Sequence, residues 1–312
     1  DKGSIVVRIL TFGTEVFSET FWKDKLQSAW YLRTQLLDFE VTNAFRVIHG
    51  EGDGISGLII DYYDKNWVIQ AHSTGVFLQM KEIAEAIQLN FPNHCDTIYC
   101  KSAGTLPNTG TDYFLFGTKA DTVAKENNIL FSVNWVEGQK TGFFLDQREN
   151  RKLLGEFSKG KKVLNTFCYT GGFSIYAMNA GAELVTSVDI SQKAVDLAAS
   201  NMELNFPKAN HTAVADDVFN FMREHTQHYD VIVLDPPAFA KSIKSKHTAT
   251  QAYKRLNIAG LKALAPNGIL FTFSCSQVID DVLFYNTVAA AAIESGRNIR
   301  VLHKLGQGPD HP

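Results

Sequence analysis

Short apolar runs rich in valine and isoleucine alternate with longer amphipathic segments from about residue 162 onward. The apolar runs predict strands, which we place at 163–167, 184–189, 212–215, 230–235, 268–274 and 299–303. The segments between them predict helices at 173–180, 192–205, 218–225, 250–264 and 278–295. Strands that alternate with helices in this way are typical of a parallel sheet covered on both faces. We therefore predict a doubly wound, Rossmann-like α/β sheet.

The first part of the chain has a mixed pattern and predicts an α+β domain. Its expected elements are a helix at 18–37 with Ser18 as N-cap, strands at 45–49, 58–62 and 67–72, a helix at 75–89, and a loop at 102–117. Four glycines at 50–57 predict a tight connection rather than a phosphate cradle, because a strand and not a helix follows them. The boundary falls in the region 120–135, and we assign residues 1–130 and 131–312 to the two domains.

Composition narrows the class of protein. Hydrophobic residues make up 45% and charged residues 20% of the 312 positions, as in globular domains. No apolar run approaches the roughly 18–20 residues that span a bilayer. The four cysteines are too scattered for a disulfide framework or a metal site. We therefore expect a cytoplasmic protein with no membrane segment and no metal.

The charge pattern leaves nucleic acid open as a partner. The net charge of −3 argues against indiscriminate polyanion binding, but phosphate contacts depend on local charge. One local excess of basic residues lies at 241–255. A solvated loop and helix face is the simpler account of it.

Polar or glycine residues follow five successive predicted strands. They are Cys168-Tyr169-Thr170-Gly171-Gly172, Asp189, Asp216-Asp217, Asp235-Pro236-Pro237-Ala238-Phe239 and Ser274-Cys275-Ser276. Ligands of doubly wound sheets bind beyond the carboxyl ends of the strands, where these residues fall. Each has a structural alternative, since a glycine pair can be a turn, an aspartate a helix cap and a cysteine a core filler. Polar or glycine residues at five strand ends of one sheet together favour a binding site.

Two classes of enzyme fit a strand–glycine turn–helix–strand–acid pattern. Asp189 ends the second strand, where a carboxylate can accept hydrogen bonds from ribose hydroxyls. A dinucleotide oxidoreductase expects Gly-x-Gly-x-x-Gly, but no glycine lies three positions after Gly172. It also gives no reason for Asp-Pro-Pro-x-Phe, whose prolines stiffen a turn that can hold Asp235 and Phe239 toward a planar substrate. The pattern favours a methyltransferase.

Several segments resemble one family. They are Asn-Thr-Phe-Cys-Tyr-Thr-Gly-Gly-Phe at 165–173, Asp-Pro-Pro-Ala-Phe-Ala-Lys at 235–241, Ser-Cys-Ser at 274–276, Gly-Gln-Lys-Thr-Gly-Phe-Phe-Leu-Asp-Gln-Arg at 138–148, and His-Gly-Glu-Gly-Asp-Gly at 49–54. Together they resemble the bacterial 23S ribosomal RNA cytosine-5 methyltransferases of the large-subunit methyltransferase I type, which are class I enzymes dependent on S-adenosylmethionine. The family usually begins with a PUA-type RNA-binding domain and ends with a further strand. We expect this chain to lack that domain.

Methylation at C5 of cytosine requires a catalytic nucleophile. An aromatic carbon is a poor methyl acceptor, and a thiolate that adds to C6 of cytosine activates C5. We expect Cys275 in this role, as the resemblance also implies, and Asp235 as the group that hydrogen-bonds the base edge. Many RNA cytosine-5 methyltransferases carry a second cysteine where this chain has Pro237, so another group or water must take the C5 proton.

The remaining residues are expected to bind cofactor or substrate. For the cofactor we expect Tyr169, Thr170, Gly171 and Gly172 around the methionine part, Asp189 at the ribose, and Asp217 or, less favoured, Asp216 at the adenine amino group. Cys168 is a further expected cofactor contact. The resemblance adds Phe144, Gln147 and Arg148, although Arg148 and Lys140 have RNA phosphate as an alternative. Pro236, Pro237, Phe239 and Lys241 are expected to hold the RNA base, which must leave its stack.

Two other functions remain open. The Asp-Pro-Pro loop also suits a methyltransferase that modifies an exocyclic nitrogen of guanine or adenine. A non-catalytic RNA-binding protein that retains the fold is the third reading. Residues 1–130 are expected to be an RNA platform or a structural cover for the sheet.

Overall fold

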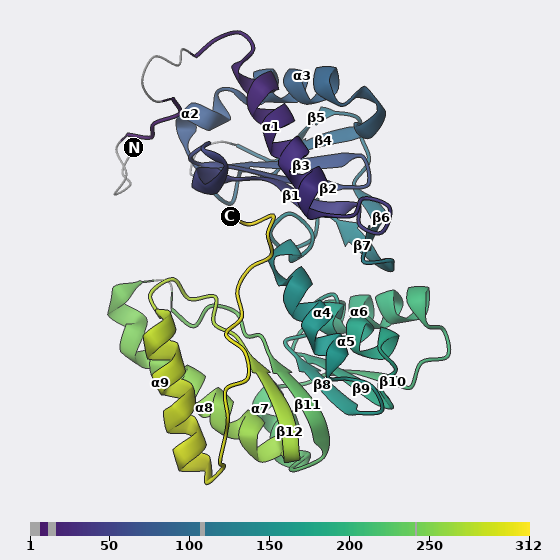
Figure 1. Cartoon of the computed structure of the whole chain (residues 1–312), viewed down its shortest axis with the longest axis vertical. Coiled ribbons are helices and arrows are strands. Elements are labelled where there is room, and N and C mark those ends of the chain that lie inside the picture. The colour runs from purple at the N-terminus through teal and green to yellow at the C-terminus, as the bar shows by residue number, and fades with distance from the viewer. Residues whose placement is uncertain (1–6, 12–16, 107–109, 241) are drawn as a thin grey trace. The chain divides into compact units, whose positions relative to one another are not determined.

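The computed structural model describes residues 7–11, 17–106, 110–240 and 242–312. The chain forms two compact units, Asp1–Glu149 with Gln307–Pro312, and Asn150–Gly306 (Figure 1). The sequence predicted the division at residue 130, but in the structure it lies after Glu149. The last six residues, Gln307–Pro312, belong to the first unit.

The first unit is built on a five-stranded mixed sheet. Its strands are β1 (Ala44–His49), β2 (Leu58–Tyr63), β3 (Asn66–Ala71), β4 (Thr97–Cys100) and β5 (Tyr113–Phe116), in that order. Only β3 and β4 run parallel within it. Its helices are α1 (Phe21–Leu36), α2 (Thr74–Phe77) and α3 (Met80–Asn90), with 3₁₀ turns η1 (Gly50–Asp53) and η2 (Pro92–His94). Apolar residues of α1, α3 and the strands share one core.

A separate hairpin explains why the first unit extends past residue 130. Strands β6 (Asp121–Glu126) and β7 (Ile129–Asn134) pair antiparallel, and both residues of the turn between them have positive φ. The N–H of Asn43 donates to the carbonyl of Lys125 at 2.8 Å, and the N–H of Lys125 donates to the side-chain Oδ1 of Asn43 at 2.5 Å. These bonds tie the hairpin to the edge of the first sheet.

The first unit differs in detail from its predicted elements. Helix α1 begins at Phe21 with Thr20 at the N-cap, so Ser18 is not its cap. The predicted helix at 75–89 is two helices, because Ser73 caps α2 and the chain leaves helical geometry at Gln79 before α3 begins. Strand β5 lies inside the predicted loop, and the short strands β4, β6 and β7 were not predicted. Short strands carry little periodicity from which to predict them.

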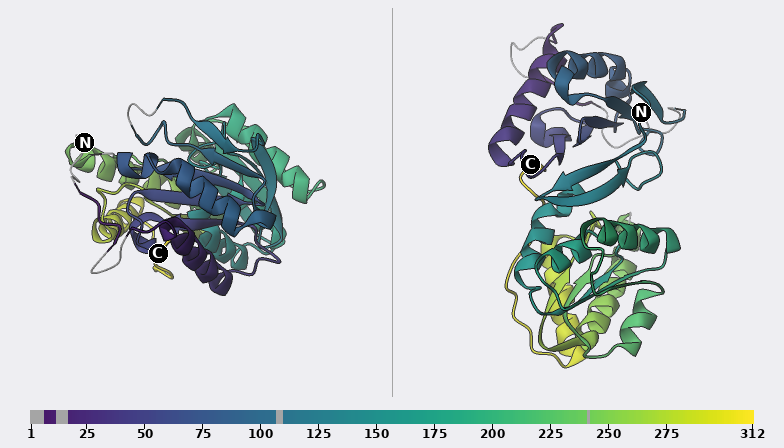
Figure 2. Two further views of the ribbon diagram at one scale, coloured as in Figure 1. Left: turned by 90° about the horizontal axis from the view of Figure 1, so that it is seen from above. Right: turned by 90° about the vertical axis from the view of Figure 1, so that its right-hand side faces the viewer.

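The second unit holds the parallel sheet. Its strands are β8 (Lys162–Thr166), β9 (Leu184–Asp189), β10 (His211–Ala215), β11 (Tyr229–Leu234) and β12 (Leu264–Thr272), in the order β10-β9-β8-β11-β12. All pairs are parallel. Its helices are α4 (Arg148–Glu156, whose first two residues belong to the first unit), α5 (Gly172–Asn179), α6 (Gln192–Asn205), α7 (Val218–Glu224), α8 (Lys246–Ala263) and α9 (Asp281–Ser295), with the 3₁₀ turn η4 (Ile243–Ser245). The 3₁₀ turn η3 (Leu145–Gln147) precedes α4 and belongs to the first unit. Helices lie on both faces of the sheet (Figure 2). The predicted doubly wound fold is confirmed.

Two predictions in this unit are wrong or incomplete. The segment 299–303 is not a strand; Ile299, Val301 and Leu302 are exposed and no ladder includes them in the described part of the chain. An apolar run forms a strand only where a sheet edge pairs with it, and pattern alone does not show that pairing. Helix α4 was not predicted.

The strand order places the site. The sheet reverses direction of winding between β8 and β11, which is the switch point where ligands bind in such folds. Thr166 lies opposite both Val188 and Leu234, and Leu234 lies opposite Thr272. The carboxyl ends of β8, β9, β11 and β12 therefore lie at the same level of the sheet, and so do the loops that follow them.

Candidate functional site

The turn after β8 has an uncommon backbone. Phe167 and Tyr169 have φ of 54° and 44°, and Gly171 has φ of 76°. Positive φ in non-glycine residues is sparsely populated and is found at binding sites more often than elsewhere. The N–H of Gly171 donates to the carbonyl of Cys168 at 2.8 Å, which closes the turn before α5 begins.

Helix α6 packs against this turn and hydrogen-bonds to it. A Cβ added at Gly171 would lie 2.9 Å from the Cβ of Ala198, closer than such atoms approach. The buried amide of Asn201 donates to the carbonyl of Thr170 at 3.0 Å. Asn201 was not predicted as a site residue, because a polar residue inside a helix gives no sign of its distant partner. The glycine turn is fixed by packing and hydrogen bonds rather than left as a loose loop.

Asp189 ends β9 beside this turn. Its Oδ2 accepts the N–H of Tyr169 at 3.2 Å, and its Oδ1 accepts the N–H of Ser191 at 3.0 Å. A carboxylate has about four acceptor positions, so two are available for ligand hydroxyls. These two bonds hold the half-buried carboxylate in one orientation.

Asp216 and Asp217 follow β10, whose last residue lies opposite Asp189. Asp217 caps α7, since its Oδ1 accepts the N–H of Asn220 at 3.0 Å. The Oδ1 of Asp216 accepts the N–H of Asp217 at 2.7 Å. Both aspartates thus have a local structural role, and each keeps a second carboxylate oxygen.

The loops after β11 and β12 meet at Cys275. The thiol of Cys275 donates to the carbonyl oxygen of Pro236 at 3.6 Å, and the N–H of Phe273 donates to the carbonyl of Leu234 at 2.9 Å. Cys275 is exposed and borders a hollow of about 200 Å³. The other residues that line this hollow are Ala238, Ala240, Gln277 and Val278. The structure brings Cys275 to the Asp235-Pro236 loop.

The substrate residues have different surroundings. Pro237 is exposed, Asp235 is half-buried and Pro236 is buried. The ring of Phe239 packs against that of Tyr253, with centroids 4.7 Å apart, and is only partly open to solvent. Lys241 lies outside the described residues. A stacking role for Phe239 stays a prediction.

The two cysteines at strand ends are not equivalent. Cys168 is buried, and burial together with the nearby Asp189 carboxylate raises the pKa of its thiol well above the usual range. Cys275 is exposed. Because the thiolate is the nucleophilic form, only Cys275 of this pair has surroundings that suit attack on a substrate.

Phe144, Gln147 and Arg148 belong to the first unit. The ammonium of Lys140 lies 4.2 Å from the ring centroid of Phe144. Gln147 ends η3. The guanidinium of Arg148 is buried and forms two hydrogen bonds with the Asp310 carboxylate, at 2.6 and 3.1 Å. The sequence pattern gave no signal for Asp310, which lies 162 residues away.

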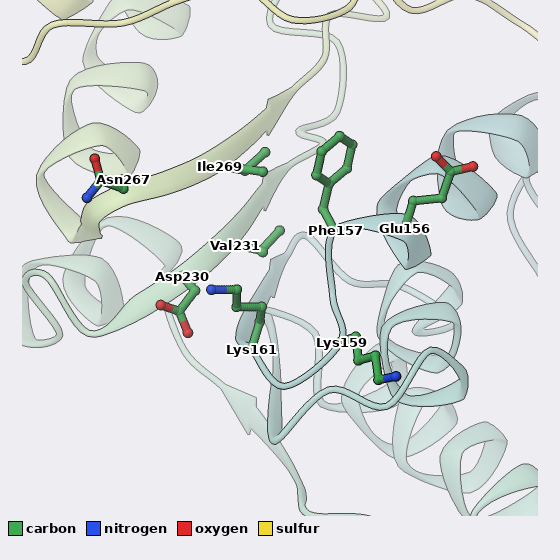
Figure 3. A pocket seen from close by; sticks show the side chains of 8 residues that line it. All are labelled: Glu156, Phe157, Lys159, Lys161, Asp230, Val231, Asn267 and Ile269. Atoms are coloured by element: carbon green, nitrogen blue, oxygen red, sulfur yellow. The ribbon is translucent and has the colours of Figure 1, made fainter.

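A second hollow, of about 300 Å³, lies at the opposite end of the parallel sheet. It opens beside the first residues of β11, and Figure 3 shows Lys161 and Asp230 on the same side of it. The hollow lies at the amino ends of these strands, whereas the residues described above follow their carboxyl ends. Within the described ranges, no cluster of three or more His, Cys, Asp or Glu side chains could hold a metal, and no helix could cross a membrane.

The chain is similar in sequence and in fold to known methyltransferases. Residues 107–312 match the family of S-adenosylmethionine-dependent methyltransferases. Ribosomal RNA large subunit methyltransferase I of Aeromonas hydrophila is 37% identical over all of this chain and 81% of its own length. A solved structure from Streptococcus mutans, described as a SAM-dependent methyltransferase, is 27% identical with a TM-score of 0.83 over 97% of this chain and 79% of its own. A solved methyltransferase complexed with SAH is 28% identical, with a TM-score of 0.81 over 96% and 78%.

Proposed function

The chain belongs to the S-adenosylmethionine-dependent methyltransferases, and on that premise we propose that it methylates C5 of a cytosine in 23S ribosomal RNA, with Cys275 as the nucleophile. The cofactor is S-adenosylmethionine. The observation that carries the proposal is the exposed thiol at the end of β12, within 3.6 Å of the carbonyl of Pro236 in the Asp-Pro-Pro loop. Relatives named ribosomal RNA large subunit methyltransferase I support RNA as the substrate.

The cofactor would be held by residues at the ends of β8, β9 and β10. In this proposal Asp189 accepts the ribose hydroxyls, and Asp217 or Asp216 accepts the adenine amino group. In the turn after β8, Tyr169, Thr170, Gly171 and Gly172 line the methionine part, and Cys168 is a further cofactor contact. The family resemblance also implies Phe144, Gln147 and Arg148 as cofactor contacts, and Arg148 is paired with Asp310.

The reaction begins at Cys275. Its thiolate adds to C6 of the cytosine, and the C5–C6 double bond becomes an enamine whose nucleophilic carbon is C5. The bound cofactor supplies an electrophilic methyl group on a sulfonium. C5 would take this methyl as the methyl–sulfur bond of the sulfonium breaks and leaves a neutral thioether. The C5 proton then goes to another group or to water, and the C6–sulfur bond breaks so that the thiolate leaves. Asp235 hydrogen-bonds the base edge throughout.

The target base must leave its stack to reach the thiol. Pro236 and Pro237 stiffen the wall of the site and Phe239 offers an aromatic surface. The hollow of about 200 Å³ beside Cys275 has mostly small or apolar walls, which suits a planar base.

The test is Cys275→Ala with unmodified ribosomal RNA, labelled cofactor and mass mapping of the modified nucleosides. We expect 5-methylcytidine from the wild type, no turnover from the variant, and unchanged cofactor affinity by titration calorimetry. Cys95→Ala, which changes a buried cysteine of the first unit, is the matched control and should remain active.

Full activity of Cys275→Ala would exclude the cytosine-C5 assignment. A methylated exocyclic nitrogen of guanine or adenine would then be the product to seek. If the wild type shows no cofactor binding, the chain is instead a non-catalytic RNA-binding protein.

A further inference from the structure

The loops after β11 and β12 are joined by a second contact besides that of Cys275. Ser276 is 3% exposed, and its Oγ accepts the N–H of Ala240 at 3.3 Å. The N–H of Ser276 in turn donates to the Oγ of Ser274 at 3.4 Å. Cys275 is thus followed by a residue whose side chain is fastened to the loop that carries Asp235.

Tyr253 of α8 contacts residues of both loops. Its hydroxyl lies 2.9 Å from the Oγ of Ser276, and its side chain is fully buried. Its ring contacts Phe239 of the first loop and Phe284 of α9, at centroid distances of 4.7 and 5.6 Å. One side chain therefore touches both loops, by its ring on one and its hydroxyl on the other.

Packing alone does not require the two hydroxyls. A phenylalanine would fill the space of the Tyr253 ring, and alanine would fit at position 276. Alanine there would remove the Oγ that bonds to the Tyr253 hydroxyl and to the Ala240 N–H. A buried hydroxyl is tolerated because it is hydrogen-bonded, and the net contribution of such a bond to stability is small. What the pair adds is a fixed relation between the backbone at Ala240 and the backbone next to Cys275.

We propose that Tyr253 and Ser276 are positioning residues that hold the thiol of Cys275 in reach of the base bound by the Asp235-Pro236 loop. The pair touches no reacting atom and acts through the two loops. The role rests on the proposed function, because it concerns the nucleophile of that reaction. Reactions held in near-attack geometry can lose about 100-fold in rate for a displacement of about 1 Å.

The test is a double-mutant cycle with Tyr253→Phe, Ser276→Ala and the double variant, in single-turnover methyl transfer to unmodified ribosomal RNA. Each single change should lower the rate constant by about 10-fold or more, within the range expected for a misplaced nucleophile. The double variant should be no slower than Ser276→Ala, because that change already breaks the contact that Tyr253→Phe removes. The dissociation constant of the cofactor and the KM for RNA should stay at wild-type values.

Tyr229→Phe is the matched control. Tyr229 is another buried tyrosine of the same unit, and its hydroxyl donates to the Oγ1 of Thr186 at 3.1 Å, away from the two loops. This variant should lose stability as Tyr253→Phe does and keep the wild-type rate constant. An equal loss of rate in Tyr229→Phe would mean that general loosening of the unit is responsible, and would overturn the proposal.

Alkylation of Cys275 gives a readout that does not depend on methyl transfer. The other three cysteines are buried, so iodoacetamide followed by peptide mass analysis reports on this thiol. We expect faster alkylation in Tyr253→Phe and in Ser276→Ala, since the thiol is no longer held against Pro236. Unchanged alkylation, unchanged rate constants, or additive effects in the cycle would each overturn the positioning role. Loss of the Cys275 assignment itself would show separately, as activity in Cys275→Ala.

Discussion

The backbone N–H of Tyr169 lies 3.2 Å from Oδ2 of Asp189 and donates a hydrogen bond to it. The bond joins the turn after β8 to the end of β9, although the two residues are 20 positions apart. It orients the carboxylate and at the same time stabilises Tyr169 in a backbone conformation with φ of 44°.

Replacement of this carboxylate should weaken cofactor binding. Asp189→Ala removes both the proposed ribose acceptor and the support of the Tyr169 turn, and hydrogen bonds to charged groups contribute about 1.5–3 kcal/mol. We expect the dissociation constant for S-adenosylmethionine to rise at least about 10-fold in titration calorimetry. Asp196→Ala, on the exposed side of α6, should bind as the wild type does, and equal binding by both variants would remove Asp189 from the site.

A methyl group at Gly171 should disturb the same turn. Gly171→Ala forces alanine to φ of 76° and brings its Cβ to 2.9 Å from that of Ala198, so the turn must shift and cofactor affinity should fall. Gly181→Ala is the matched control, because φ is 87° there but the nearest atom is the Cγ of Lys159 at 3.9 Å. Both variants should lose about 1–3 kcal/mol of stability from backbone strain. Calorimetry should show weaker binding only for Gly171→Ala.

Loss of the buried ion pair between Arg148 and Asp310 should destabilise the first unit. Burial alone would raise the pKa of Asp310, but hydrogen bonding with His311 and the Arg148 guanidinium outweigh it and hold that pKa well below its usual range. Asp310→Ala leaves Arg148 buried without this partner and should reduce the free energy of unfolding by about 3–5 kcal/mol. Glu85→Ala breaks an exposed pair with Lys81 and should cost less than about 0.5 kcal/mol in the same denaturant titration. Similar losses in the two variants would contradict this prediction.

His211 should make the second unit less stable as the pH falls. Burial lowers the pKa of His211 to about 4, and its ring nitrogen Nε2 lies 2.8 Å from the Oγ of Ser187. The unfolded chain takes up a proton near the ordinary pKa of about 6.5, while the folded protein does not until about pH 4. Stability is therefore complete above about pH 6.5 and declines as the pH falls toward 4.

The measurement for His211 is a series of urea titrations between pH 7 and pH 5. His211→Gln removes the titrating group, so its midpoint should fall less over this range than that of the wild type. Parallel midpoints for the two proteins would show that His211 does not contribute to the pH dependence.

Local pattern was sufficient for much of the second unit. The strand β9 and the helix α6 have the predicted bounds, because a run of buried residues and a capped amphipathic segment are each visible in consecutive residues. The first unit was harder to predict, since β4 and β5 have four residues each and owe their structure to pairing with other strands. Intrinsic strand preference is weak compared with that pairing.

The sequence by itself determined the doubly wound sheet and the set of residues at its strand ends, Asp189, Asp235 and Cys275 among them. Only the tertiary structure decided that Cys275 is exposed while Cys168 is buried, that Arg148 pairs with Asp310, and that Tyr253 reaches Ser276. The physical reason is that periodicity along the chain reports which face of an element is buried. Which side chains meet there depends on strand register and helix packing between segments far apart in the sequence, and no short stretch of residues encodes that.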